Sequence, residues 1–520
     1  MSIELFTYLS QGTGAGITPH YLPGIIVTAA TLLLLLVISV KRSHALAAVI
    51  TGAGLVLAAL AQFALLQAPA ASASLFHFDA INTLLSLLLL LLLIFLWAQM
   101  PGWLAGQEEP REEYYLLFQL AGLGGWAMLA SNHFASFFLA LELMSLSLVG
   151  LISYRASLSD SLEAGIKYLV LSSLASALIL MGMALLYLQS GSLAFAAVFT
   201  PGSQETQASA YGITAAVFII TGLMFKLSLV PCHLWAADIF EGAPLPSTAL
   251  LAVLSKLASF ILLWRLFGMA LWYDNPLLMQ LIALVAAASM LLGNLLALQQ
   301  RQLLRLLAFS SIAHFGYLLL TLLLLGRPDS TGQAPTATSS LHAGSGIDAG
   351  MGLATEALLF YLIAYLLTLT ATFSLLLRLR HINRLEQLSG LFWYKPLTAA
   401  ALALLMLSFA GVPLTLGFVG KFYLISAAVA GQLWWLLYVL VIASVIGLFY
   451  YLRVIMVMLE RRDDPLVLGK AAATAGYGVS LPMGQTGLAE TLLSSLVILL
   501  IVGLGTFPGQ LATYLNSLIP

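Results

Sequence analysis

The chain has 520 residues, of which 61% are hydrophobic and only 8% charged, and its formal net charge is −1. Soluble domains carry about 25% charged residues, so this composition excludes an ordinary hydrated surface and predicts an integral membrane protein. The single cysteine, Cys232, has no partner for an intrachain disulfide and gives no cysteine ligand set for iron–sulfur or zinc. The sequence contains no phosphate-binding GxxxxGK[ST] loop, so nucleotide binding is not predicted.

Apolar segments long enough to cross a membrane recur along the whole chain. A helix needs about 20 apolar residues to cross roughly 30 Å of hydrocarbon. The sequence therefore predicts an all-α polytopic fold, one integral membrane domain over residues 1–520, with about fourteen transmembrane helices. The predicted spans are residues 22–40, 44–66, 80–100, 113–131, 133–153, 163–188, 211–238, 247–267, 277–298, 302–325, 353–378, 397–430, 433–458 and 488–513.

The loops between these spans differ in cationic charge. The odd-numbered loops contain fourteen lysine and arginine residues, and the even-numbered loops contain two. Because cationic loops favour the cytoplasmic side, both termini are expected to face outward, which is the periplasm in a bacterial inner membrane.

Two features recur at nearly the same offset and predict an internal repeat. The pattern Glu-Ala-x-x-x-Tyr-Leu starts at Glu163 and again at Glu356, and a mid-span lysine occurs as Lys226 and as Lys421. Five spans separate each pair, so the two copies would be inverted relative to one another, as in many transporter cores. Chance matches in a chain rich in leucine and alanine are the alternative. The predicted inverted repeats, each a half-channel, are residues 113–267 and 277–458.

Spans seven and twelve are predicted to be broken helices. Pro231 follows Lys226 in span seven, and Pro413 precedes Lys421 in span twelve. Proline removes a helix hydrogen bond and clashes with the preceding turn, and irregular backbone at membrane depth is tolerated only beside protein or water. A proline kink alone is often only structural, but two kinks beside two intramembrane lysines favour a functional role.

Ionisable residues within the spans are the candidate functional residues. Glu142, Lys226 and Lys421 lie deep in their spans, where each charge costs about 2.5 to 3.5 kcal/mol even on a lenient scale. Lys256 lies in span eight, whereas Lys167 is only a few residues into span six and is able to extend to the headgroups. Pairing or a water-filled path would reduce the cost of the deep charges.

The residue types favour proton transfer over cation conduction. A charged lysine is a poor ligand for Na⁺ or K⁺, whereas a lysine that approaches and leaves a carboxylate exchanges a proton near neutral pH. His233 and His314 are candidate titratable links, and a structural role in a helix turn is the alternative for each.

Five segments closely resemble the antiporter-like subunits of proton-translocating NADH:quinone oxidoreductase, respiratory complex I. The resemblance runs over nearly the whole chain. The segments are Ser161-Leu-Glu-Ala-Gly-Ile-Lys167-Tyr168, Phe225-Lys226-Leu-Ser-Leu-Val-Pro231-Cys-His233-Leu-Trp235, Glu241-Gly-Ala-Pro244-Leu-Pro246, Ser255-Lys256 and Gly417-Phe-Val-Gly-Lys421-Phe-Tyr423.

The resemblance implies a role for each candidate residue. Glu142 and Lys226 would form the functional pair of the first half-channel, and Lys421 would occupy the matching site of the second. His233 and Lys256 would continue a central polar axis. Lys167 matches a lysine of the family. Cys232 departs from the aromatic residue expected between Pro231 and His233, which puts only local packing in doubt.

The resemblance also implies partners and cofactors. The chain would be the proton-translocating part of an enzyme complex, with no redox centre of its own, beside other membrane-arm subunits in the lipid bilayer and without nucleic acid. FMN, iron–sulfur clusters and quinone are expected in partner subunits. Two alternatives remain from the residues alone: a subunit of a cation/proton antiporter complex, and a non-translocating scaffold in which the charges only fix helix packing.

Overall fold

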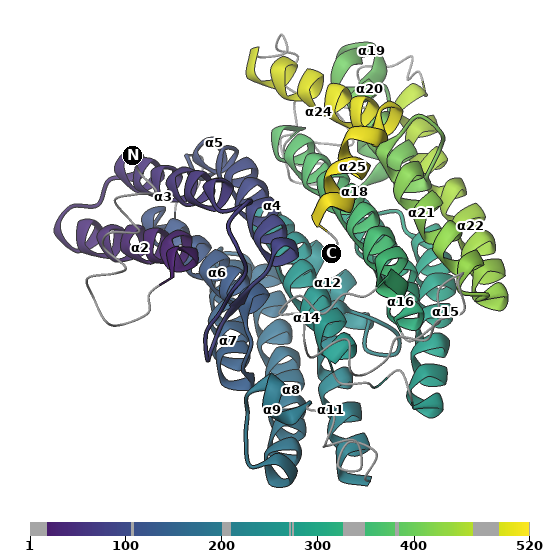
Figure 1. Cartoon of the computed structure of the whole chain (residues 1–520). Helices are drawn as coiled ribbons and strands as arrows, with labels where there is room; N and C mark the ends of the chain where they lie inside the picture. Colours follow the sequence, from purple (N-terminus) through teal and green to yellow (C-terminus); the bar gives the residue numbers. More distant parts are fainter. Residues whose placement is uncertain are drawn as a thin grey trace.

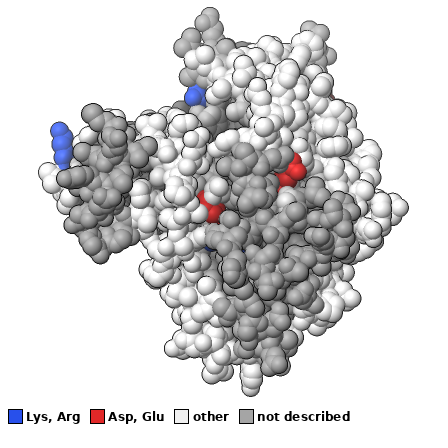
Figure 2. Space-filling model, in the orientation of Figure 1, with Lys and Arg blue, Asp and Glu red and all other residues white. Residues whose placement is uncertain are grey.

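The computed structural model describes residues 18–105, 109–199, 210–269, 272, 275–325, 349–379, 384–460 and 488–518. Within these residues, eleven helices are long and apolar enough to cross a membrane, or twelve if the bent pair Leu492–Thr506 and Pro508–Leu515 is one span. The predicted all-α polytopic fold is confirmed. On the face in Figure 2, the described surface carries only a few charged residues, as a chain surrounded by lipid requires.

The helices fall into two length classes. The long helices are α2 (Leu22–Val40), α3 (His44–Ala64), α4 (Ala80–Trp97), α6 (Glu112–Ala130), α7 (Phe134–Ile152), α8 (Ser159–Ser190), α11 (Ala210–Leu227), α15 (Pro276–Gln299), α16 (Leu303–Leu324), α18 (Ala349–Leu379), α22 (Trp434–Leu459) and α24 (Leu488–Thr506). The shorter elements are η1 (Pro19–Tyr21), α5 (Met100–Leu104), α9 (Phe195–Val198), α12 (Leu234–Gly242), α13 (Leu245–Leu250), η3 (Leu251–Ser255), α14 (Lys256–Met269), η5 (Leu385–Leu388), α19 (Leu391–Tyr394), α20 (Pro396–Ala410), α21 (Leu416–Ala430) and α25 (Pro508–Leu518). A small antiparallel hairpin of β1 (Ala71–Ser72) and β2 (His77–Phe78) lies between α3 and α4.

Helices lie at all fourteen predicted spans, but the count of fourteen membrane crossings is not confirmed. Helix α6 begins with Glu112 and Glu113 and falls outside the group of helices apolar enough to cross. The predicted span 397–430 is divided into α20 and α21. Each of these has 15 residues and is therefore about 22 Å long, shorter than the hydrocarbon core.

The two halves of the chain lie on either side of a central group of helices. Figure 1 shows α2, α3, α6 and α7 on one side, α20, α21 and α22 on the other, and α12, α14 and α16 between them. The most apolar 18-residue stretches of the segments Leu245–Met269 and Leu303–Leu324 are completely buried inside the protein. Polar side chains on α14 and α16 are therefore surrounded by protein rather than by lipid.

Two pairs of helices pack through a glycine in the same way. A Cβ atom on Gly124 of α6 would lie 2.6 Å from the backbone nitrogen of Met144 in α7. A Cβ atom on Gly293 of α15 would lie 2.8 Å from the backbone nitrogen of Ala313 in α16. Both glycines and both partners are separated by the same 169 positions. This offset differs from the 193 residues that separate Glu163 and Glu356, and the inverted repeat stays a prediction.

Candidate functional site

The predicted break in span seven is confirmed. Helix α11 ends at Leu227, one residue after Lys226, and α12 begins at Leu234. Within the break, Ser228 has a φ of 60°, and the backbone N–H of Val230 donates to the Ser289 hydroxyl at 3.1 Å. The Ser289 side chain thus satisfies a backbone N–H that the break leaves outside a helix, as the membrane interior requires.

The predicted break in span twelve is also confirmed. Helix α20 ends at Ala410, Gly411 follows with a φ of 77°, and α21 begins at Leu416. A φ in this range is strained for residues with a side chain, so glycine allows the chain to leave the helix at this point. Lys421 lies in the second turn of α21, close to the break.

Lys226 is held by hydroxyl groups rather than by a carboxylate. Its side chain is buried, and its Nζ donates to Ser145 Oγ at 2.7 Å and to Ser172 Oγ at 2.6 Å. The carboxylate of Glu142 accepts a hydrogen bond from Ser176, one helical turn beyond Ser172 on α8. Among the ion pairs of the described residues, none joins Glu142 to Lys226 within 4 Å. Serines of α7 and α8 therefore contact each charge separately: Ser176 contacts Glu142, and Ser145 and Ser172 contact Lys226.

Lys256 is buried in the central helices without an ion pair in the described part of the chain. Only 1% of it is exposed, its Nζ donates to the Ser311 hydroxyl, and the same atom lies 5.7 Å from the ring centre of Phe240 and 5.3 Å from that of Phe315. The one-turn π-helix η3 ends directly before it, at Ser255. The hydroxyl and the two aromatic faces offset part of the free-energy cost of burying this amine.

His314 is the centre of a buried group of tyrosines. Its Nδ1 lies 2.6 Å from the Tyr361 hydroxyl and its Nε2 lies 3.1 Å from the Tyr451 hydroxyl. The ring of Tyr365 lies 4.8 Å away, centre to centre. The Tyr451 hydroxyl also pairs with Ser310. Because an imidazole nitrogen donates or accepts according to its tautomer, this arrangement supports proton transfer in either direction.

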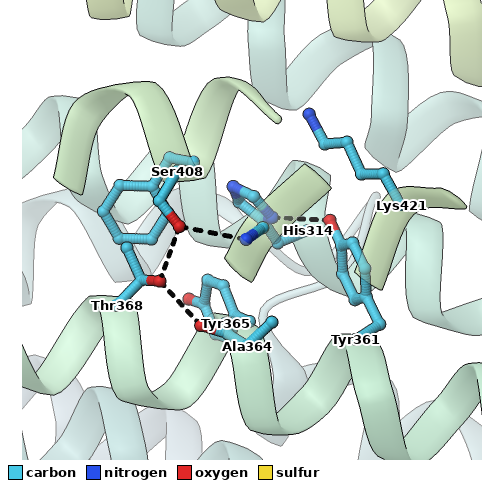
Figure 3. Close-up of a pocket in the computed structure, with 9 residues that line it drawn as sticks. His314, Tyr361, Ala364, Tyr365, Thr368, Ser408 and Lys421 are labelled. Carbon is cyan, nitrogen blue, oxygen red and sulfur yellow. Dashed lines mark hydrogen bonds between the residues drawn. The ribbon is translucent and has the colours of Figure 1, made fainter. Parts of the chain in front are cut away.

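A small cavity lies between His314 and Lys421. Figure 3 shows the hydrogen bond between His314 and Tyr361, with the Lys421 side chain beside Tyr361 and with Ser408 and Thr368 on the far side of His314. Lys421 Nζ donates to the Ala410 carbonyl at 2.8 Å and lies 5.5 Å from the Tyr317 ring centre. The cavity is lined by His314, Tyr361, Ala364, Tyr365, Thr368, Ser408, Phe409, Gly417 and Lys421.

His233 lies in the break of span seven, directly before α12. It is 8% exposed, and its Nδ1 lies 3.2 Å from the Pro231 carbonyl. In the described part of the chain, no hydrogen bond joins His233 to Lys226 or Lys256.

Lys167 lies apart from the buried lysines, in a cluster of ion pairs that joins α8, α12 and α16. Its side chain is 40% exposed, and its Nζ lies 2.7 Å from Glu163 and 3.1 Å from Asp238. Arg305 of α16 bonds the same Asp238 at 2.9 Å and Glu241 at 2.8 Å. The placement fits its position near the start of span six.

Lys167→Ala is expected to lower the stability of the protein by no more than about 1 kcal/mol, because exposed ion pairs contribute little. Asp238→Ala should cost more, since it releases both Lys167 and Arg305. Thermal unfolding of the purified protein, followed by tryptophan fluorescence, measures both. A larger loss from Lys167→Ala than from Asp238→Ala would contradict this assignment.

The structure adds hydroxyl residues that the sequence analysis did not identify. Ser145 and Ser172 contact Lys226, Ser311 contacts Lys256, and Tyr361 and Tyr451 contact His314. Ser145 lies three residues after Glu142, on the same helix face, which was an available signal. The tyrosines had no comparable signal as a pair, because they lie 90 residues apart in the chain.

The comparisons with known proteins agree with this architecture. A family model described as NADH:quinone oxidoreductase/Mrp antiporter, TM, matches residues 131–334 and 337–447. The NADH-quinone oxidoreductase subunit N of Shewanella woodyi is 52% identical over 501 residues, which cover 96% of this chain and 99% of that protein.

Two solved structures are similar along nearly the full length. A chain of respiratory complex I from Thermus thermophilus, solved with bound aureothin, matches with a TM-score of 0.75 and 28% identity, over 94% of this chain and 98% of its own. A chain of the Mrp complex from Dietzia sp. matches with a TM-score of 0.79 over 96% of both chains, and its 22% identity shows the fold alone.

The fold and the matched segments define an antiporter-like membrane subunit of the type shared by NADH:quinone oxidoreductases and Mrp antiporters. Within this class, the chain belongs to the NADH-quinone oxidoreductase subunit N family. The resemblance found in the five sequence segments is thereby confirmed.

Proposed function

We propose that this chain translocates protons outward as a membrane-arm subunit of an NADH:quinone oxidoreductase. The observation that carries the proposal is Lys226, a buried amine at a broken helix whose hydrogen bonds go to the neutral hydroxyls of Ser145 and Ser172. Such an amine is able to release and regain a proton without breaking a permanent ion pair. Lys256, His314 and Lys421 continue a line of buried titratable groups across the central helices.

The roles of the candidate residues follow their surroundings. Glu142 and Lys226 act as the pair of the first half-channel, each bonded to serines, and Lys421 acts in the second half-channel. Lys256 and His314 connect the two, whereas His233 and Lys167 lie at the margins of this line. The repeats 113–267 and 277–458 form the two half-channels.

The energy for this movement comes from electron transfer in partner subunits. FMN, iron–sulfur clusters and quinone belong to those partners, and this chain holds no redox centre. Its neighbours are other membrane-arm subunits of a bacterial inner membrane, and both of its termini face the periplasm. The name of the Shewanella woodyi relative and the match to a complex I chain support this assignment.

Purification through a tag on this chain tests the proposal. Flavin- and iron–sulfur-containing subunits should copurify, and proteoliposomes containing the assembly should take up protons when NADH and a quinone are supplied. A subunit of a cation/proton antiporter complex, the alternative with the same fold, should copurify without flavin and exchange protons only for Na⁺ or K⁺. That second result would overturn the proposal.

A further inference from the structure

Tyr168 of α8 is a buried tyrosine whose hydroxyl has no hydrogen bond of normal geometry. It is 2% exposed, and its hydroxyl lies beside the hydroxyls of Ser145, Ser172 and Ser255. Its ring packs on Trp235, 5.7 Å between ring centres. Burying a polar hydroxyl is unfavourable without strong hydrogen bonds, so packing alone does not explain why this residue is a tyrosine rather than a phenylalanine.

The neighbours of Tyr168 belong to two different lysine sites. Ser145 and Ser172 are the two hydrogen-bond acceptors of Lys226. Ser255 is the last residue of η3 and directly precedes Lys256. The Tyr168 hydroxyl therefore lies between the groups that surround Lys226 and the start of the helix that carries Lys256.

The second half of the chain contains the same relation in a bonded form. Tyr168 and Tyr361 are corresponding residues of the recurring Glu-Ala-x-x-x-Tyr-Leu pattern. The matching glycine contacts of α6–α7 and α15–α16 place Ser145 and His314 at corresponding positions, since both are separated by the same 169 residues. Tyr361 hydrogen-bonds His314, just as Tyr168 lies beside Ser145.

We propose that the Tyr168 hydroxyl is a proton-relay group that connects the Lys226 site to the Lys256 site. The Lys226 ammonium gives a proton to Ser172, which passes its own proton to Tyr168. Tyr168 passes its own proton to Ser255, which delivers its proton toward the neutral amine of Lys256. Each hydroxyl ends with the one hydrogen that it had at the start, and the net change is one proton moved from Lys226 to Lys256.

The inference rests on the proposed proton-translocating function and adds a residue to it. Tyr168→Phe removes the hydroxyl and keeps the ring on Trp235. Because the variant also removes a buried hydroxyl that lacks strong hydrogen bonds, the protein should fold and assemble at least as well as the original. A merely structural tyrosine would give the same assembly and unchanged pumping.

The test measures proton uptake and NADH oxidation by the whole complex in proteoliposomes. Tyr168→Phe should lower the rate of NADH-driven proton uptake about tenfold, which is less than the 10²- to 10⁴-fold rate effect typical of a positioned proton-transfer group. Tyr187→Phe is the matched control, because it lies on the same helix, is 54% exposed and should pump normally. Normal pumping by Tyr168→Phe would overturn the inference.

Lys226→Ala measured in the same preparation separates the two hypotheses. If Lys226→Ala stops pumping and Tyr168→Phe does not, the relay role of Tyr168 is wrong and the proposed function stands. If both variants pump normally, the proposed function itself fails. Ser255→Ala is a second test, which leaves Tyr168 in place and remains informative even if Tyr168→Phe fails to assemble. Lowered pumping by Ser255→Ala supports the relay, and unchanged pumping contradicts it.

Discussion

Replacing Lys226 with alanine is expected to abolish NADH-driven proton pumping while leaving the complex assembled. The substitution removes the amine that Ser145 and Ser172 bind, and these two hydroxyls are then free to pair with one another. Glu142 keeps its hydrogen bond from Ser176, so no newly unpaired buried carboxylate opposes folding. Loss of a positioned proton-transfer group typically lowers a rate by about 10² to 10⁴, so pumping should fall to the background leak.

The measurement is proton uptake by proteoliposomes during NADH oxidation, with the oxidation rate recorded separately. Lys41→Ala is the control, because Lys41 is an exposed lysine at the end of α2 and belongs to no part of the buried line. Unchanged pumping by Lys226→Ala would show that the buried lysines only fix helix packing.

Gly417→Ala is expected to prevent stable folding of the second half of the chain. A Cβ atom on Gly417 would lie well inside contact distance of the backbone carbonyl oxygen of Ser408. The backbone N–H of Gly417 also donates to the Ser408 hydroxyl at 3.1 Å, which fixes the two segments together. Relief would require α20 and α21 to move apart, at a cost of about 1 to 3 kcal/mol or more.

The yield of assembled complex and its thermal unfolding midpoint measure this effect. Gly102→Ala is the control, since a Cβ atom on Gly102 meets no atom within 4 Å. Equal midpoints for Gly417→Ala and the original protein would show that the two helices separate without penalty, and that the break is not rigidly packed.

The sequence predicted the two breaks because proline acts locally. Pro231 and Pro413 remove backbone donors whatever their tertiary neighbours are, and each lies within eight residues of an intramembrane lysine. The number of membrane crossings was harder to predict from the sequence. Glu112 and Glu113 make α6 too polar for the criterion that α7 meets, although both are helices in the structure.

The candidate residues were predictable as types, but their partners were not. A buried lysine requires compensation, and the family resemblance implied that the Glu142 carboxylate would pair with Lys226. The structure supplies serine hydroxyls: Ser145 was accessible from its spacing to Glu142, whereas Ser172 lies on another helix and had no local signal. The contacts of His314 with Tyr361 and Tyr451 depend on how α16, α18 and α22 pack, which no local pattern encodes.

The carbonyl that Lys421 contacts belongs to the last residue of α20. The C-terminal end of a helix carries roughly half a negative charge, because its final carbonyls have no partner within the helix. The break at Gly411 therefore places the negative pole of a dipole against the Lys421 amine, to which no carboxylate of the described residues is bonded. Because this partial charge belongs to the backbone, it does not depend on which side chain occupies position 410.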